Sequence, residues 1–213
     1  MILESLITTK DQLGHVNIAP LGPIVYPPQK PDQLPSFLLR PYAGSTTCEN
    51  LLVNGKGVIH VTDDVLLLAQ TAIGRVDTTE LVCPAANMSS EFVRLKDCHR
   101  WFAVEVQHYG GTPPRHELKA KCVAEGVVPP FFGFNRAKHA VIEAAIMATR
   151  IGMIDSQVIL RSLGELRIAV TKTAGQDESD AFDLVEAFIL ERLAQPDAAQ
   201  VDRASESSVD GLG

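Results

Sequence analysis

Residues 36–64, SFLLRPYAGSTTCENLLVNGKGVIHVTDD, predict a strand, a hydroxyl-rich turn, a short helix and a second strand in succession. The first strand covers residues 37–42, and Arg40 lies near its end. Asn54 and Gly55 should end the helix after about two turns, because glycine is the usual residue of a left-handed helix cap. A helix this short is not stable alone in water. The segment therefore requires a larger fold that covers it.

Three hydroxyl side chains, Ser45, Thr46 and Thr47, stand where this helix begins. Backbone N–H groups in a first turn have no intrahelical partner, so a helix N-terminus attracts anions, phosphate above all. Arg40 arrives from the preceding strand and can add a bidentate contact. A second interpretation needs no ligand, because Thr46 and Glu49 match an ordinary capping box. The motif alone leaves both interpretations open.

The length and composition indicate one large domain or two small ones. With 213 residues, 46% of them hydrophobic, the chain can bury a substantial core. The net charge of −7 argues against a nucleic-acid-binding surface, which needs clustered lysine and arginine. The last nineteen residues carry −3 of that charge and almost no large apolar group. Residues 195–213 are therefore predicted to form a disordered acidic tail.

The cysteines and the N-terminal residues indicate in which compartment the protein is expected. The four cysteines match no zinc or redox spacing, and free buried thiols are expected at Cys48, Cys83, Cys98 and Cys122. The N-terminal MILESLITTKDQLG has no basic region followed by a long apolar one, and no apolar run approaches the length of a membrane span. We therefore expect a soluble, cytoplasmic protein without a membrane partner.

Predicted strands and helices are segregated along the chain. Residues 1 to about 128 are β-rich, with a proline-rich loop at 23–35 and one buried helix at 65–73, capped by Asp63 or Asp64. Strands are expected at 2–8, 15–25, 92–96, 101–109 and 117–127, and helices at 135–152, 155–173 and 178–193. Strands followed by helices indicate an α+β fold, or a barrel with a helical appendage.

The helix predicted at 135–152 has an uneven polar face. At about 100° per residue, Arg136, His139, Glu143 and Arg150 fall within an arc of roughly 60°. This polar stripe could hold an anionic substrate, with His139 as a proton donor or relay. Composition alone favours a solvated face supported by the i,i+4 pair of His139 and Glu143. The preceding VVPPFFGF, residues 127–134, predicts an aromatic wall that lines a planar ligand or plugs a barrel end.

Several common catalytic sites have no support in the sequence. His60, His99, His108 and His116 have no acidic partner at metal-ligand spacing, so they are interpreted as strand residues and no metal site is predicted. No G-x-S-x-G, H-E-x-x-H, Walker or Rossmann pattern occurs. The sequence therefore lacks the usual motifs of hydrolases, zinc proteases and nucleotide-driven motors.

Four segments together resemble a known family. VNIAPLGPIV, RPYAGSTTCENL, VIHVTDD and FNRAKHAVIEAAIMATR resemble an uncharacterised family of FMN-binding split-barrel proteins, domain-of-unknown-function family 447. It belongs to the wider flavin-reductase-like and pyridoxamine-phosphate-oxidase-like group. The similarity covers residue 2 to about residue 193. It implies an α+β fold with an FMN-binding split β-barrel over 1–130, a helical subdomain over 131–194 and the tail 195–213.

The resemblance also implies where FMN would bind. In the wider group, an arginine from a barrel strand and polar groups around the next short helix hold the phosphate, while the strand after the first hairpin lies along the isoalloxazine ring. Phosphate contacts carry over to Arg40, Ser45, Thr46, Thr47 and Asn50, and ring contacts to Asn17, Ile18, Ala19 and Pro20. Many such proteins are homodimers with FMN at the interface, and the exposed edges of an open sheet also favour a homodimer.

One departure from the family pattern concerns the charge near the phosphate. Relatives often have a lysine or a second arginine there, whereas this turn has none. Glu49 lies nearby and would weaken anion binding by up to about 1 kcal/mol unless it folds back to the cap.

Two functions follow from the resemblance. The first is an FMN-dependent oxidoreductase that acts on a small planar or anionic molecule, with His139, Arg136 and Glu143 as catalytic candidates. The second is a non-catalytic FMN carrier, sensor or assembly factor, with a family context that suggests pterin-linked one-carbon metabolism.

Overall fold

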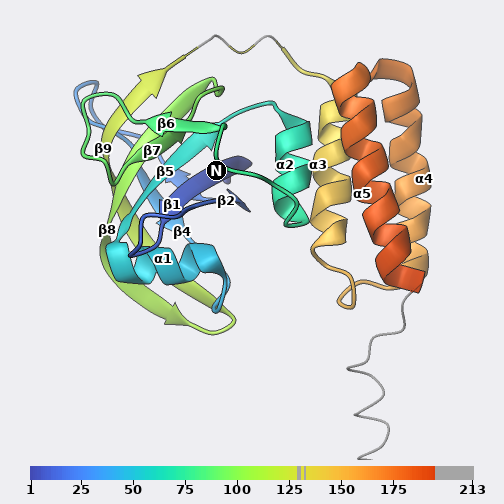
Figure 1. The fold of residues 1–213 in the computed structure, drawn as a ribbon, viewed down its shortest axis with the longest axis horizontal. Helices are drawn as coiled ribbons and strands as arrows, with labels where there is room; N and C mark the ends of the chain where they lie inside the picture. The colour runs from blue at the N-terminus through green and yellow to red at the C-terminus, as the bar shows by residue number, and fades with distance from the viewer. Residues whose placement is uncertain (129–130, 132, 195–213) are drawn as a thin grey trace, which may run out of the picture.

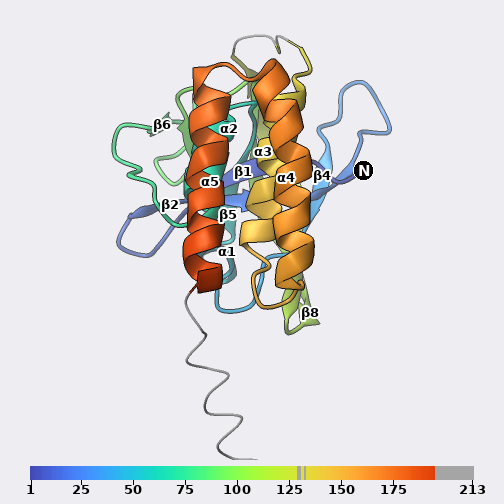
Figure 2. The same cartoon turned by 90° about the vertical axis from the view of Figure 1, so that its right-hand side faces the viewer.

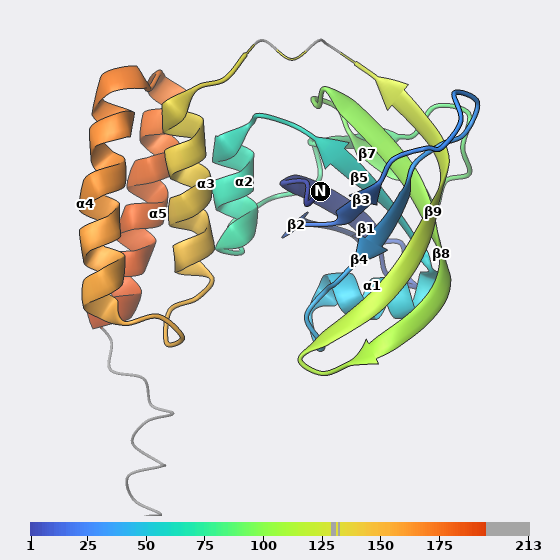
Figure 3. The ribbon, with the colours of Figure 1, turned by 180° about the vertical axis from the view of Figure 1, so that it is seen from behind.

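Seven strands form one antiparallel sheet in the order β2-β1-β5-β8-β9-β4-β3, and β6 pairs with β7 in a separate two-stranded sheet. Figures 1 and 3 show that the large sheet is strongly curved. The computed structural model describes residues 1–128, 131 and 133–194, so the predicted tail 195–213 lies outside the described residues. The strands are β1 Ser5–Lys10, β2 Val16–Leu21, β3 Ile24–Tyr26, β4 Ser36–Leu39, β5 Lys56–Val61, β6 Val82–Pro84, β7 Val93–Leu95, β8 Arg100–Thr112 and β9 Arg115–Val127.

The ladder of the large sheet does not close, because β2 and β3 are its two ends. The segment before β1 reaches β3 through a single bridge between Ile2 and Ile24, beside a 2.8 Å hydrogen bond from the Val25 N–H to the Met1 carbonyl. The strand predicted at 15–25 is wrong as one element, since it is two strands separated at Gly22 and Pro23. Proline has no N–H for the ladder, which accounts for the break. The predicted α+β class is confirmed.

Five helices complete the fold: α1 Thr46–Asn54, α2 Val65–Ala72, α3 Arg136–Ala148, α4 Ser156–Thr173 and α5 Gln176–Ala194. All three C-terminal helices predicted from the sequence are present, within a few residues of the expected bounds. Figures 1 and 2 show α3, α4 and α5 packed side by side as a layer, with the sheet on one side of it.

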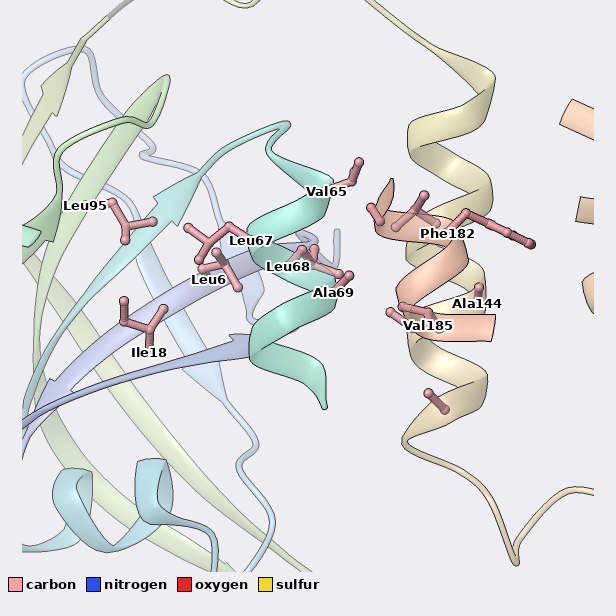
Figure 4. Packing of buried hydrophobic residues seen from close by; sticks show 14 of the residues in the cluster. Leu6, Ile18, Val65, Leu67, Leu68, Ala69, Leu95, Ala144, Phe182 and Val185 are labelled. Atoms are coloured by element: carbon pink, nitrogen blue, oxygen red, sulfur yellow. The ribbon is translucent and has the colours of Figure 1, made fainter. Parts of the chain in front are cut away.

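Helix α2 lies between the sheet and the helical layer, which confirms the buried helix predicted from its apolar sequence (Figure 4). Its Leu67 points toward Leu6 of β1, whereas Ala69 faces Phe182 and Val185 of α5. These residues belong to one continuous apolar core that joins the two halves of the chain. A second core, which includes Phe37 and Phe102, fills the inside of the curved sheet.

An ionic cluster also joins the sheet to the helices. Asp63, just after β5, accepts a hydrogen bond from Lys138 Nζ at 2.6 Å, and its other oxygen lies 2.8 Å from His99 Nε2. Lys138 also lies 3.7 Å from Glu178 of α5. Burial alone would raise the pKa of Asp63, but the hydrogen bonds and charges of Lys138 and His99 hold it below its usual value. The cluster therefore keeps Asp63 ionised at the junction.

His60 is a strand residue, as predicted, and it is fully buried in β5. Its Nδ1 donates to the Leu6 carbonyl at 3.2 Å, while its Nε2 accepts from the Leu95 N–H at 3.0 Å. This pairing requires a neutral ring, and burial lowers the pKa of His60 to about 3. The cysteines are free and three are buried, as expected, with Cys83 half-buried. None of the described helices is long and apolar enough to cross a membrane.

Candidate functional site

Helix α1 begins at the turn that the sequence singled out. Ser45 is its N-cap, since the Ser45 hydroxyl accepts from the Cys48 N–H at 3.2 Å and donates to the Tyr42 carbonyl at 2.8 Å. The capping box proposed for Thr46 and Glu49 is therefore wrong. Gly55 ends the helix in the left-handed conformation (φ 65°), as predicted. No described residue accepts a hydrogen bond from the N–H of Thr46 or Thr47, which leaves two donors at this terminus.

Polar side chains hold the first turn of α1 against the sheet. Thr47 is buried, and its hydroxyl accepts a hydrogen bond from Asn17 Nδ2 of β2 at 3.0 Å. Asn50 donates to Thr9 Oγ1 of β1 at 3.0 Å and is buried on that side of the helix. Asn50 therefore holds α1 against β1, and it does not line the cleft that Arg40 lines. The Thr47 hydroxyl proton is directed to no described acceptor and can be donated to a ligand.

Two arginines meet beside this turn. Arg40 follows β4, and among the described residues its Nε is the one buried side-chain nitrogen or oxygen without a hydrogen-bond partner. Arg115 begins β9, donates from Nη1 to the Arg40 carbonyl at 3.0 Å and places its guanidinium 3.9 Å from the centre of the Tyr42 ring. Both side chains therefore bring positive charge to the space beside this turn. Buried polar groups are nearly always hydrogen-bonded, so the unpartnered Nε of Arg40 indicates that an acceptor from a ligand binds there.

Arg115 is the cation that the turn itself lacks, and sequence reasoning missed it. It stands 75 positions from Arg40, and the pairing of β4 with β9 brings the two together. The backbone fixes this approach, because the His116 N–H donates to the Pro41 carbonyl at 3.1 Å. No local motif marks Arg115. Only its position at the start of a strand, directly after the Pro113-Pro114 turn between β8 and β9, could have suggested it.

The arginines line a cleft of about 280 Å³, called here the arginine cleft. It is bounded by β2 and its end, the segment after β4, the start of β9, the start of α1 and the ends of α2 and α3. The lining residues are Glu4, Ala19, Pro20, Leu21, Gly22, Arg40, Pro41, Tyr42, Ser45, Thr47, Ala72, Arg115 and Thr149. The sequence predicted five of these as FMN contacts: Ala19, Pro20, Arg40, Ser45 and Thr47.

A second space of about 640 Å³ adjoins the arginine cleft, and the two share Ala19, Ser45 and Thr47. We call it the neutral chamber. Its walls are β2, the turn before α1, the end of α2 and the loop that follows α2, with the lining residues Val16, Asn17, Ile18, Ala19, Gly44, Ser45, Thr46, Thr47, Thr71, Gly74, Val76 and Thr78. The wall formed by residues 71–78 was not anticipated from the sequence.

The polar stripe of α3 lies elsewhere. Arg136, His139, Glu143 and Arg150 are all exposed, and none of them lines the arginine cleft or the neutral chamber. Of these four residues, Arg150 is the nearest in sequence to a residue that lines the arginine cleft, because Thr149 precedes it. The ionic cluster that joins sheet and helices uses Lys138 instead, which points away from this stripe.

The predicted aromatic wall is described only in part, because residues 129, 130 and 132 lie outside the described residues. Phe131 and Phe134 are exposed and meet edge to face, with ring centres 5.5 Å apart. Phe131 also contacts His99, and Phe134 contacts His139. These two rings therefore border the ionic cluster and the polar stripe, and neither lines the two spaces beside Arg40.

Two family models match this chain. Residues 3–128 match the model described as protein of unknown function (DUF447) N-terminal domain, and residues 135–187 match protein of unknown function (DUF447). The chain belongs to the DUF447 family. The resemblance drawn from RPYAGSTTCENL and its companion segments is therefore confirmed.

One solved structure has the same fold. This DUF447 protein superposes on the FMN-bound protein MM1853 from Methanosarcina mazei with a TM-score of 0.73 and 22% sequence identity, over 88% of this chain and 94% of that one. Lower similarity is found with the styrene monooxygenase flavin reductase from Pseudomonas putida S12 (TM-score 0.48, 17% identity, 61% and 83% covered) and flavoredoxin from Methanosarcina acetivorans (TM-score 0.47, 14% identity, 60% and 69% covered).

Proposed function

We propose that this DUF447 protein binds FMN and acts as an FMN-dependent oxidoreductase. The observation that carries the proposal is the unpartnered, buried Nε of Arg40, beside the two unpaired N–H groups of Thr46 and Thr47. A phosphate offers several acceptor oxygens and negative charge, and so supplies what these donors lack. Arg115 adds a second guanidinium to the same cleft.

The two adjoining spaces fit the two ends of FMN. The arginine cleft suits the phosphate, and the neutral chamber suits the uncharged isoalloxazine ring, with residues 17–20 of β2 along it. A relative with the same fold is described as FMN-bound, which supports this assignment. When bound, FMN would supply the redox chemistry. The protein's part is to hold the phosphate, orient the ring along β2 and shield it with the end of α2.

Architecture and assembly complete the proposal. In this proposal the curved sheet is the β part of the FMN-binding split barrel predicted over residues 1–130, and α3, α4 and α5 make up the helical subdomain predicted over 131–194. The exposed edges of β2 and β3 favour a homodimer as the smallest stable form. Both spaces open to solvent, which favours an enzyme over a sealed FMN carrier. Light scattering that reports a 23.1 kDa particle at micromolar concentration would refute the dimer.

Titration with flavins tests the proposal directly. FMN should bind more tightly than riboflavin, which lacks the phosphate, by about 2–3 kcal/mol, the usual worth of a charge-assisted contact. Quenching of flavin fluorescence measures both affinities. Equal affinities would contradict the phosphate assignment. The oxidoreductase activity is tested by anaerobic mixing of the FMN-loaded protein with NADH or NADPH, in which bleaching of the flavin absorbance is expected.

A further inference from the structure

The charge of the two adjoining spaces differs sharply. Arg40, Arg115 and Glu4 line the arginine cleft, whereas no ionisable side chain is found among the described residues that line the neutral chamber. The shared residues Ser45 and Thr47 mark the boundary between the two. A ligand long enough to enter both spaces would therefore meet its counter-charges at one end only.

Hydrogen bonding inside the protein takes up some of the side-chain polar groups that line the neutral chamber. Thr71 donates its hydroxyl to the Leu68 carbonyl at 2.9 Å, and Asn17 Nδ2 donates to Thr47. By contrast, no described residue hydrogen-bonds the side-chain hydroxyls of Thr46 and Thr78. The chamber therefore offers neutral hydroxyls on walls that mix polar and apolar residues, a setting that can pair with a carbonyl or hydroxyl group.

We propose that the part of the neutral chamber that the flavin ring leaves open, on the side of Thr71 and Thr78, binds an uncharged organic molecule that carries a carbonyl, amide or hydroxyl group. The inference rests on the proposed function, since the phosphate of FMN engages the guanidiniums of Arg40 and Arg115. Because the chamber is open to solvent, a carboxylate there would give up only part of its hydration, but it would gain no counter-charge from the described lining residues. A neutral carbonyl needs only a single hydroxyl donor. The proposal replaces the anionic substrate inferred from the polar stripe with a neutral one.

Matched pairs of small probes test the proposal. FMN-loaded protein is titrated with benzamide and benzoate, and with nicotinamide and nicotinate. Flavin absorbance and, by calorimetry, the heat of binding are measured for each probe. Members of each pair share a shape and differ in charge. Each amide should bind at least tenfold more tightly than its carboxylate. Thr78→Lys places a cation in the chamber wall and should remove or reverse that preference, whereas Thr78→Glu should keep or widen it.

Thr78 suits this test because its side chain is half-buried at the chamber. Its backbone hydrogen bond, from the Leu81 N–H to the Thr78 carbonyl, does not depend on the side chain. Gln157→Lys, on exposed α4, adds the same charge away from the chamber and should leave the preference unchanged. Melting temperatures identify any variant that fails to fold.

Each outcome decides the matter. A carboxylate that binds the wild-type protein as tightly as its amide would overturn the inference. Binding of none of the four probes, or a preference unaltered in folded Thr78→Lys, would also overturn it. Failure of the protein to retain FMN would instead overturn the proposed function, and the absence of flavin absorbance before any probe is added distinguishes the two.

Discussion

Asn17 Nδ2 lies 3.0 Å from Thr47 Oγ1, and this hydrogen bond joins β2 to the first turn of α1. Both residues line the neutral chamber, and Thr47 also lines the arginine cleft. Asn17 further approaches Thr9 Oγ1 of β1, at 3.4 Å. In the proposed complex, β2 lies along the flavin ring and α1 holds the phosphate. The hydrogen bond therefore fixes the distance between the parts of the site that hold the two ends of FMN.

Thr47→Val tests this connection. The substitution keeps the shape of the side chain but removes the hydroxyl, so unfolding free energy should fall by about 1 kcal/mol and FMN affinity should fall as well. Urea denaturation and flavin titration measure the two effects. Thr46→Val is the matched control, because Thr46 is exposed and should cost less than about 0.5 kcal/mol in stability. Equal effects of the two variants on stability would contradict the structural role of the Asn17–Thr47 bond.

Substitution of the two arginines should separate phosphate binding from ring binding. Arg40→Gln should weaken FMN by about 2–3 kcal/mol and leave riboflavin unchanged, because in the proposed complex the buried Nε of Arg40 donates to the phosphate, which riboflavin lacks. Arg115→Gln should weaken FMN by less, about 1 kcal/mol, since Arg115 is exposed to solvent. Arg161→Gln, on the exposed face of α4, serves as the control. If both cleft variants weakened riboflavin as much as FMN, the phosphate would not lie in the arginine cleft.

Much of the site is local in sequence and was therefore predictable. The strand that leads to Arg40, the N-terminus of α1 and its stop at Gly55 follow from hydrophobic pattern and cap chemistry over some twenty residues. Arg115 was not predictable in this way, because the pairing of β9 with β4 depends on the whole sheet. The same holds for the loop after α2, which reaches β2 only because α2 packs between sheet and helices.

Side-chain direction was harder to predict than element type. Asn50 follows Thr47 by one turn of the same helix, yet its amide faces β1 and bonds Thr9, which no sequence pattern distinguishes from a ligand contact. Arg136, His139 and Glu143 lie on α3 as predicted, whereas Arg150 lies beyond its end, and periodicity cannot say what the polar face meets. The structure exposes it, and the ionic link to the sheet comes from Lys138 on another face.

Acid should destabilise this protein through His60. Its pKa is about 3 in the folded protein and about 6.5 when unfolded, so between these values the unfolded state binds the additional proton. Unfolding free energy should therefore fall as the pH is lowered from about 6.5 toward 3. The lowered pKa of Asp63 acts in the same direction, because its contribution is lost as the pH falls below the usual aspartate value.

His60→Gln isolates the contribution of His60 to the pH dependence of the unfolding free energy. This variant cannot gain a proton at position 60, so its unfolding free energy should depend less steeply on pH between about 6.5 and 5, although it should be less stable than wild type at pH 7 through lost packing and hydrogen bonds. Urea denaturation at several pH values gives both slopes. Identical slopes for the two proteins would show that His60 takes up no additional proton on unfolding.

The polar stripe is best tested against a neighbour on the same helix. Arg136, His139 and Glu143 are exposed, so alanine at each position should change stability by less than about 0.5 kcal/mol. Lys138→Met should cost more, about 1–3 kcal/mol, because it leaves partly buried Asp63 without its 2.6 Å partner. A destabilisation by His139→Ala as large as that by Lys138→Met would show that the stripe is structural.

The same variants test the catalytic role proposed for the stripe. If Arg136, His139 and Glu143 serve the flavin reaction, His139→Ala should slow flavin turnover by ten-fold or more while FMN affinity and melting temperature stay at the wild-type values. The positions of these side chains, outside both the arginine cleft and the neutral chamber, argue for the opposite result. Rates of flavin reduction and reoxidation in His139→Ala and wild type, measured at matched FMN occupancy, decide between the two. Unchanged rates would leave the stripe as a solvated face, and the reacting groups would then be sought among the residues that line the two spaces beside Arg40.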